Sequence, residues 1–230
     1  MKDNKTMRCR VACAPMRKDE SDRSEMINQL LYGEEVEILS ENGKWYFVRL
    51  KFDGYEGYVE KQLIKSFEDN STWNYHILAH QIVDFEEETL TLPFGAQTQH
   101  GSEATLGLDW SINQFLGVPY LWGGKTTFGT DCSGFVQTAF RVIGINLPRD
   151  AYQQVEVGKT IHFSNETIPG DLAFFSNAQG KIIHVGICIG NNEIVHASGW
   201  VKIDLLDQQG IFNRETQQYS HQLATIKRVI

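Results

Sequence analysis

The sequence predicts an α+β protein in which a small all-β unit precedes a unit of helices and antiparallel strands. Short runs of aromatic and β-branched residues, separated by tight-turn signals, fill residues 33–64. A helical pattern covers residues 132–143, and four strand patterns follow between residues 171 and 205. Because the helical pattern precedes a run of strands instead of alternating with them, an α+β arrangement is favoured over a parallel α/β one.

The first part of the chain is predicted to contain a small β-barrel. Residues 35–39 (EVEIL) alternate, and residues 45–50 (WYFVRL) are rich in aromatic and β-branched side chains. A turn signal at residues 41–44 (ENGK) separates them, and another at 53–54 precedes a strand pattern at 55–59 (YEGYV). Strands this short, joined by tight turns, are typical of a small barrel.

This order of strands and turns resembles bacterial SH3-like domains over about residues 7–65. The resemblance rests on the successive sequence segments LLYGEEVEIL, GKWYFVRL and GYEGYVEKQLI. It implies an SH3-like domain at residues 1–65 that binds ligand or positions a catalytic domain. A module that serves only as a structural lid is the alternative.

Residues 66–104 hold most of the excess acidic charge. The 230 residues carry a formal net charge of −8, and this segment contains seven acidic residues and no Lys or Arg. Strand patterns at residues 75–85 and 89–92 flank an acidic run at 86–88 (EEE), which is predicted to be a solvated turn. The segment is therefore predicted to be either an acidic β connector or a degenerate second SH3-like unit.

A cysteine at the start of the long helical pattern is the candidate nucleophile. Asp131 is the predicted N-cap of the helix at residues 132–143, so Cys132 would lie in its first turn. Free backbone N–H groups and the helix dipole favour an anion there, which lowers the pKa of a thiol. The thiolate is the nucleophilic form of cysteine, and it still needs a base to accept its proton.

Two histidines on successive strand patterns could supply that base and its orienting group. His184 and His196 lie twelve residues apart. A simple two-residue hairpin at Asn191 and Asn192 would place the two imidazoles on opposite faces of the sheet. We therefore predict an odd-length connection or a β-bulge around residues 190–193.

On spacing alone, Cys132 could equally be a core residue and the histidines could be structural. Five short sequence motifs favour a catalytic role for these residues. In chain order they are YLWGG (120–124), DCSGF (131–135), PGDL (169–172), HVGI (184–187) and VHAS (195–198). Together they resemble the NlpC-type, papain-like cell-wall cysteine peptidases over about residues 105–230. The resemblance implies a papain-like catalytic domain in which a helix packs on an antiparallel sheet.

The same resemblance implies roles for individual residues. Cys132 would be the nucleophile, His184 the general base and acid, and His196 the polar group that orients the imidazole. The substrate cleft would be lined by Tyr120, Asp131, Ser133, Arg149 and Asp150. The alternatives are a pure helix cap for Asp131 and a packing aromatic for Tyr120. No metal or cofactor is expected.

An SH3-like module followed by such a domain resembles the γ-D-glutamyl-L-diamino-acid endopeptidases. The resemblance implies cleavage between D-glutamate and a diamino acid in murein (peptidoglycan) peptides with a free N-terminal L-alanine. Glu25 would hold the ammonium group, with Tyr55, or as second choice Tyr58, beside it. A solvated Glu25 and a core Tyr55 are the alternatives. An amidase or acyltransferase on the same scaffold, or a non-catalytic wall-binding module, are the alternative functions.

Composition restricts the partners and the location. The excess of acidic residues argues against binding to nucleic acid. No apolar run reaches the roughly 18 residues needed to cross a bilayer, so no contact with a membrane is expected. The polar start MKDNKTMRCR lacks the apolar core of a secretory signal, so a cytoplasmic location is expected, or a periplasmic or secreted one if a signal has been removed. Four scattered cysteines favour reduced thiols over a disulfide framework or a metal site. We expect a monomer that binds a murein-derived peptide.

Overall fold

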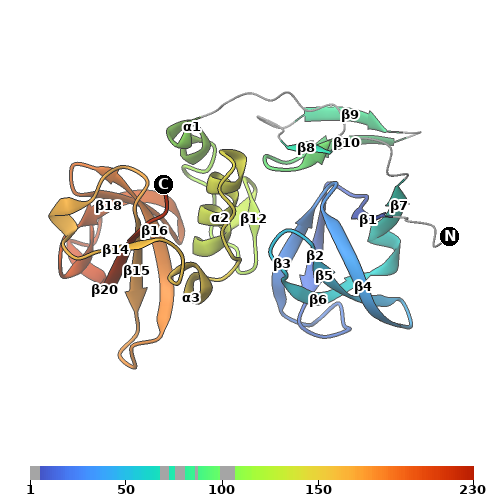
Figure 1. Cartoon of the computed structure of the whole chain (residues 1–230), viewed down its shortest axis with the longest axis horizontal. Coiled ribbons are helices and arrows are strands. Elements are labelled where there is room, and N and C mark those ends of the chain that lie inside the picture. The colour runs from blue at the N-terminus through green and yellow to red at the C-terminus, as the bar shows by residue number, and fades with distance from the viewer. Residues whose placement is uncertain (1–5, 68–72, 76–80, 86–87, 99–106) are drawn as a thin grey trace. The chain divides into compact units, whose positions relative to one another are not determined.

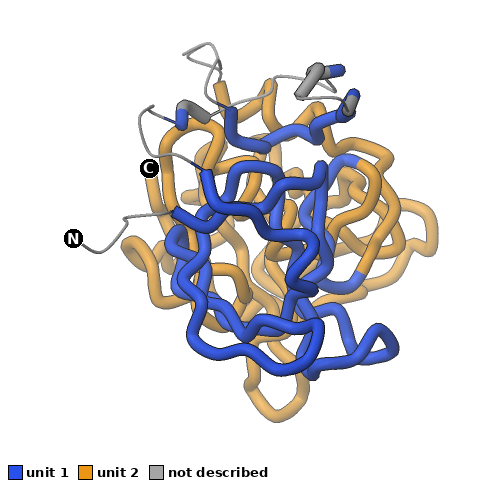
Figure 2. Tube along the Cα trace, turned by 90° about the vertical axis from the view of Figure 1, so that its right-hand side faces the viewer, with its two compact units in different colours: residues 1–105, 122–127 blue, residues 106–121, 128–230 orange. Residues whose placement is uncertain are grey.

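The computed structural model describes residues 6–67, 73–75, 81–85, 88–98 and 107–230. The chain divides into two compact units (Figure 2). Unit 1 comprises Met1–Thr105 with Trp122–Thr127, and unit 2 comprises Leu106–Leu121 with Phe128–Ile230. None of the described helices is long and apolar enough to span a membrane. The predicted domain boundaries at residues 65 and 104 stay predictions.

Seven strands of unit 1 form one antiparallel sheet in the order β3-β2-β6-β5-β4-β1-β7 (Figure 1). Their bounds are β1 Thr6–Cys9, β2 Cys13–Arg17, β3 Met26–Leu31, β4 Glu35–Asn42, β5 Trp45–Leu50, β6 Glu56–Glu60 and β7 Ile64–Phe67. Alternate residues of neighbouring strands make the core, as the β pattern predicts: Val36 of β4 lies opposite Leu50 of β5, and both are buried.

The described part of residues 66–104 belongs to unit 1. It contains β8 Asn74–Tyr75, β9 Gln81–Phe85, β10 Glu88–Leu92 and β11 Gln97–Thr98, which pair as β9 with β10 and β8 with β11. Leu92 and Ala96 pack in one buried cluster with Leu31 and Tyr32 of the preceding sheet region. Of the predicted acidic turn, Glu86 and Glu87 lie outside the described residues.

Unit 2 is built around a closed sheet. Its strands run in the order β14-β20-β15-β16-β17-β18-β19, and β19 also pairs with β20, so six strands close into a barrel with β14 at its edge. The bounds are β14 Lys159–Ile161, β15 Leu172–Ser176, β16 Ile182–Gly190, β17 Glu193–Ser198, β18 Trp200–Leu206, β19 Gly210–Asn213 and β20 Gln218–Arg228. The predicted antiparallel sheet is present, but the last two strands, which close it, were not predicted.

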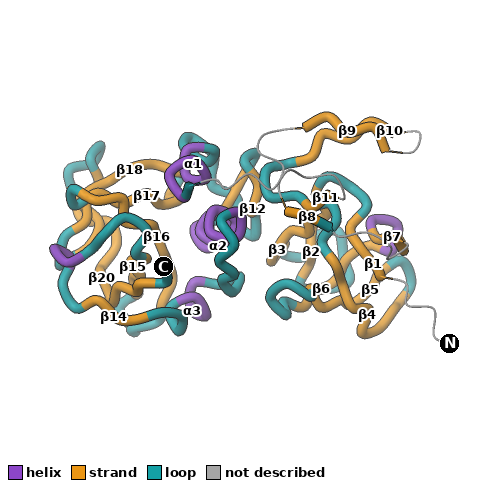
Figure 3. The backbone as a smooth tube through the Cα atoms, turned by 45° about the horizontal axis from the view of Figure 1, so that its top comes forward, coloured by secondary structure: helices purple, strands orange, loops and turns teal. Residues whose placement is uncertain are grey.

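Three helices of unit 2 lie on one side of this barrel (Figure 3). They are α1 Leu108–Asn113, α2 Cys132–Val142 and α3 Ala151–Gln154, and the two-residue strands β12 Lys125–Thr126 and β13 Gly129–Thr130 precede α2. Helix α2 is buried along its whole length and packs against β16 and β17. It begins at Cys132 because the Asp131 side chain, as N-cap, accepts a hydrogen bond from the backbone N–H of Gly134.

Candidate active site

The hairpin β16–β17 places His184 and His196 on the same face of the sheet. Its turn is the two-residue pair Asn191 and Asn192, both left-handed with φ of 53° and 59°, as a type I′ turn requires. The ladder then shifts between Cys188 and Gly190, so that one extra residue is accommodated in β16. The predicted β-bulge is therefore confirmed.

The register of the hairpin brings the two imidazoles together diagonally. His196 lies directly opposite Gly186, two residues from His184, so the histidines are diagonal and not direct cross-strand neighbours. A Cβ atom added to Gly186 would lie 2.9 Å from the Cβ of His196 and 2.7 Å from the Cδ1 of Ile194. Gly186 therefore leaves room for the side chains of Ile194 and His196.

Replacing Gly186 with alanine should push the two histidine rings apart. Because a misplacement of about 1 Å at a catalytic group can cost on the order of 10²-fold in rate, we expect kcat to fall by roughly that factor. Gly107→Ala is the matched control, since nothing lies within 4 Å of the Cβ added there. Equal rates for the two variants in steady-state hydrolysis would contradict this role of Gly186.

A hydrogen-bonded chain runs from His184 through His196 to Asp204 of β18. The Nε2 of His184 lies 2.9 Å from the Nδ1 of His196, and the Nε2 of His196 lies 3.0 Å from the Oδ2 of Asp204. Burial acts to raise the pKa of Asp204, but hydrogen bonds from His196 and from the backbone N–H of Arg214 outweigh it and lower the pKa, so the carboxylate is ionised.

The ionised carboxylate determines the tautomer of both histidines. Asp204 can only accept, so the Nε2 of His196 carries a proton and its Nδ1 offers a lone pair. That lone pair accepts the Nε2–H of His184, which leaves the Nδ1 of His184 with a lone pair of its own. His184 is therefore held as a base at Nδ1. Sequence analysis did not identify Asp204, because only the register of β17 against β18 brings it to His196.

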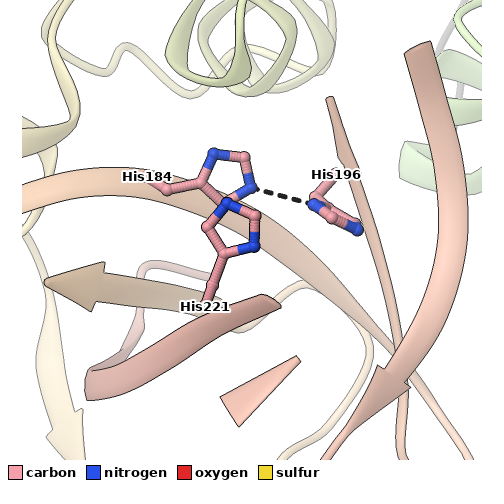
Figure 4. Close-up of side chains that lie close together, drawn as sticks. All are labelled: His184, His196 and His221. Carbon is pink, nitrogen blue, oxygen red and sulfur yellow. Dashed lines mark hydrogen bonds between the residues drawn. The ribbon is translucent and has the colours of Figure 1, made fainter. Parts of the chain in front are cut away.

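A third imidazole, His221 of β20, stacks on His184 (Figure 4). The two ring centroids are 4.2 Å apart with an interplanar angle of 22°. The Nδ1 of His221 lies 2.8 Å from the Oγ of Ser220. No sequence motif surrounds His221, and the closure of the barrel by β20 is what brings it to the site.

Cys132 is the first residue of α2 and is buried, with 7% of its surface exposed. Burial, and then the neighbouring Asp131 carboxylate, raise the pKa of the Cys132 thiol to about 12, although the backbone amides of Val185 and Ser133 act in the opposite direction. The prediction that the helix N-terminus lowers this pKa is therefore wrong for the resting site, because desolvation of the thiolate outweighs the helix terminus. The contact with Val185 places the thiol beside the residue that follows His184.

Burial keeps the base uncharged as well. The pKa of His184 lies well below its usual value, because burial disfavours the imidazolium and because His221 and His196 are close. The resting pair is therefore a neutral thiol and a neutral imidazole. We therefore expect proton transfer from Cys132 to His184 to accompany nucleophilic attack.

A cavity of about 270 Å³ opens at the histidines. It is lined by Tyr120, Ile183, His184, Ala197, Ser198, Gly199 and His221. Burial, together with the nearby Cys132 and Asp131, raises the pKa of Tyr120, so this hydroxyl stays protonated. Tyr120 thus lies at the cavity and is influenced by the charge of Cys132, and its contact with substrate stays a prediction.

Asp131, Ser133 and Arg149 form a buried network at the start of α2. Arg149 donates to both carboxylate oxygens of Asp131, at 2.9 and 2.6 Å, and to the Oγ of Ser133 at 3.0 Å. Asp131 therefore acts as a helix cap and as an ion-pair partner. Asp150 is the N-cap of α3, and its backbone N–H donates to the Oε1 of Gln153. Contact of these four residues with substrate stays a prediction.

Removing the charge of Arg149 should destabilise unit 2 strongly. Arg149 is 1% exposed, so Arg149→Met leaves the Asp131 carboxylate buried without its bidentate partner. Breaking a buried pair in this way costs about 3–5 kcal/mol of unfolding free energy. Urea unfolding measures the change, with Arg214→Met, which removes an exposed pair with Glu193, as the control. A loss below about 1 kcal/mol for Arg149→Met would contradict this assignment.

In unit 1, Glu25 lies just before β3 and is exposed. Its Oε1 accepts the indole N–H of Trp122 at 2.7 Å, and its Oε2 lies 3.7 Å from the Nζ of Lys18. Tyr55 is half-buried and packs against the core of unit 1. Tyr58, also half-buried, packs its ring on Phe47.

A buried ion pair anchors the segment that carries Trp122. The Nζ of Lys125 lies 2.9 and 3.0 Å from the two carboxylate oxygens of Glu34, and both side chains are 1% exposed. The backbone N–H of Lys125 donates to the Oε1 of Gln29. These contacts tie the segment Trp122–Thr127 to the other residues of unit 1. Sequence analysis missed the ion pair, since 91 residues separate the two charges.

Comparisons with known proteins agree with this arrangement. Residues 117–220 match the NlpC/P60 family, and residues 16–64 match the bacterial dipeptidyl-peptidase Sh3 domain. The chain is 31% identical over 211 residues to the Gamma-D-glutamyl-L-lysine dipeptidyl-peptidase of Bacillus subtilis, covering 74% of this chain and 71% of that protein. It is 50% identical over 92 residues to the Murein DD-endopeptidase MepS/Murein LD-carboxypeptidase of Escherichia coli, covering 39% of this chain and 45% of that protein.

A solved structure shares the fold. The crystal structure of an NlpC/P60 family protein from Bacillus cereus superposes with a TM-score of 0.77 at 21% identity, over 97% of this chain and 99% of that one. The two matched domains and the relative that aligns along most of its length point to one family. The chain belongs to the NlpC/P60 family of peptidoglycan hydrolases, which are cysteine-type peptidases of papain-like fold, and it carries a bacterial SH3 domain ahead of the peptidase domain.

Proposed function

We propose that the chain is a cysteine endopeptidase that hydrolyses the bond between γ-D-glutamate and a diamino acid in murein peptides with a free N-terminal L-alanine. The observation that carries the catalytic part is the hydrogen-bonded chain His184–His196–Asp204 at the wall of the cavity, with Cys132 beside Val185. The choice of bond is supported by the Bacillus subtilis relative, whose name specifies a γ-D-glutamyl-L-lysine substrate.

In the proposed mechanism, the Nδ1 of His184 accepts the thiol proton as the Sγ of Cys132 attacks the γ-glutamyl carbonyl carbon. The backbone N–H of Cys132 and a neighbouring donor stabilise the resulting oxyanion. The imidazolium of His184, stabilised through His196 by the Asp204 carboxylate, then gives its proton to the leaving amine of the diamino acid. Water, deprotonated by His184, hydrolyses the thioester and regenerates the thiol.

Glu25 is proposed to bind the free ammonium group of the N-terminal L-alanine, beside Tyr55. The hydrogen bond from Trp122 orients the carboxylate, and the ammonium group of the substrate would compete for it with the exposed Lys18, whose Nζ lies 3.7 Å away. The remaining proposed cleft residues, Tyr120 and Asp131 among them, would position the peptide near the thiol.

Glu25→Gln tests this assignment, because it removes the charge and keeps an oxygen that can accept from Trp122. A charged hydrogen bond contributes about 1.5–3 kcal/mol, so we expect kcat/KM for a free-amine peptide to fall by about 10- to 100-fold. The N-acetylated peptide, which has no ammonium group, is the control substrate. A loss of the same size on both peptides would remove Glu25 from substrate binding.

Two other functions make different predictions. An amidase or acyltransferase on the same scaffold would release other products from a murein tripeptide, or would transfer the acyl group to an acceptor other than water. A non-catalytic wall-binding module would bind the peptide without turnover, and the complete set Cys132, His184 and His196 argues against it. Mass analysis of the products separates all three functions.

A further inference from the structure

The imidazole of His221 has no part in the proposed hydrolysis, yet it lies against both histidines that do. The ligand atoms of His184, His196 and His221 all lie within 4.8 Å of one another, and Figure 4 shows the His221 ring stacked on the ring of His184, which is hydrogen-bonded to His196. We propose that these three histidines bind a divalent transition-metal ion of the zinc class, and that the bound ion inhibits the peptidase. The inhibition rests on the proposed function, whereas the binding does not.

Partners outside the cluster engage only one nitrogen of His196 and one nitrogen of His221, so that a metal ion would compete with the hydrogen bond between His184 and His196. The Nε2 of His196 is engaged by Asp204, which leaves Nδ1, and the Nδ1 of His221 is engaged by Ser220, which leaves Nε2. The Nε2 of His184 faces the Nδ1 of His196 at 2.9 Å. Two of the three rings are therefore oriented by an outer partner, and a carboxylate on the second nitrogen is the usual companion of a metal-bound histidine.

The chemistry of the cluster favours zinc, copper or nickel over magnesium or calcium. Neutral imidazole is a ligand for the first group, whereas the second group requires oxygen atoms. Three histidines hold zinc at about 2.0–2.1 Å with a fourth position left for water or another ligand. Two of the three rings, His184 and His221, line the cavity, which gives the ion an entry path and room for that fourth ligand.

Inhibition follows from the position of one proton. In the metal-free site the Nε2 of His184 carries the proton and its Nδ1 is the base. A metal ion that binds the Nε2 lone pair requires the proton to move to Nδ1, with no net proton gained or lost by the neutral ring. The Nδ1 then has no lone pair for the thiol of Cys132, so the base is lost while the ion is bound.

The binding test uses the full chain with Cys132→Ala, so that neither a thiolate nor turnover contributes. Co²⁺ binding is followed by visible absorption, and Zn²⁺ binding is followed by calorimetry. Each titration is expected to show one equivalent of metal ion bound, and the Co²⁺ spectrum is expected to show nitrogen ligands. Adding His221→Gln or His221→Asn is expected to weaken metal binding by more than about 100-fold. That loss exceeds the effect of removing only a residue that hydrogen-bonds to a metal ligand. Adding His162→Gln, at an exposed histidine elsewhere in unit 2, should leave the affinity unchanged.

Three outcomes would overturn the proposal: no binding by the Cys132→Ala chain, unchanged affinity after both His221 substitutions, or equally tight binding of Mg²⁺.

The inhibition test compares Zn²⁺ titrations of wild type and His221→Gln, each relative to its own metal-free rate. We expect the inhibitory concentration to rise at least tenfold in the variant, and an unchanged value would assign inhibition to the thiol. Binding without any peptidase activity would instead refute the proposed function and leave the metal site intact.

Discussion

Replacing Cys132 with alanine is expected to abolish hydrolysis of murein peptides. The side chain supplies the atom that bonds to the acyl carbon, so its loss should lower kcat by on the order of 10⁶-fold, as when a catalytic triad loses its nucleophile. Because the thiol is buried at the first turn of α2, alanine fits the same space. Thermal unfolding is therefore expected to stay close to that of wild type.

Cys13→Ala is the control for this variant, since Cys13 is a half-buried cysteine of unit 1 and should be dispensable for turnover. The chelator EDTA is expected not to lower the rate of the wild type, because no step of the mechanism uses a metal ion. Full activity of Cys132→Ala, or loss of activity with EDTA, would contradict a cysteine mechanism.

The second large effect is expected at Asp204, a residue that only the register of β18 brings to the site. An asparagine there presents an N–H₂ group to the Nε2 of His196, which then becomes an acceptor and moves its proton to Nδ1. His196 would donate to the Nε2 of His184, which leaves the proton of His184 on Nδ1. Since the wrong tautomer faces the thiol, Asp204→Asn should lower kcat by on the order of 10²- to 10⁴-fold.

A structural role for Asp204 predicts a different result. Asp207→Asn, at an exposed carboxylate three residues further on, is the matched control for rate and for thermal unfolding. Nitrogen chemical shifts of labelled histidine should report the change of tautomer at His196 directly. If Asp204→Asn lowers the stability while kcat and the tautomer stay as in wild type, the positioning role is wrong.

Features for which local pattern and chemistry impose the same constraint could be predicted from the sequence. The N-cap at Asp131 and the start of α2 follow from the capping preference of a short acidic side chain. The β-bulge in the hairpin was predictable because a two-residue turn alone would separate His184 from His196. These features depend on residues that are close together in the chain.

Features that depend on strand register, on burial or on contacts between distant parts of the sequence could not be predicted from the sequence. Asp204 and His221 reach the site through strand register, and neither lies in a recognisable motif. The ion pair of Glu34 with Lys125 joins charges that no local pattern links. The raised pKa of Cys132 is a consequence of burial, and a helix position alone predicts the opposite direction.

Mass analysis of a digested tripeptide is the most direct test of the proposed activity. The substrate is L-Ala-γ-D-Glu-L-lysine or its diaminopimelate counterpart, incubated with the full chain and, in parallel, with Cys132→Ala. We predict two products from the wild type, L-Ala-D-Glu and the free diamino acid, and none from the variant. Release of L-alanine, an intact tripeptide, or the same products from the Cys132→Ala chain would contradict the assignment of bond and nucleophile.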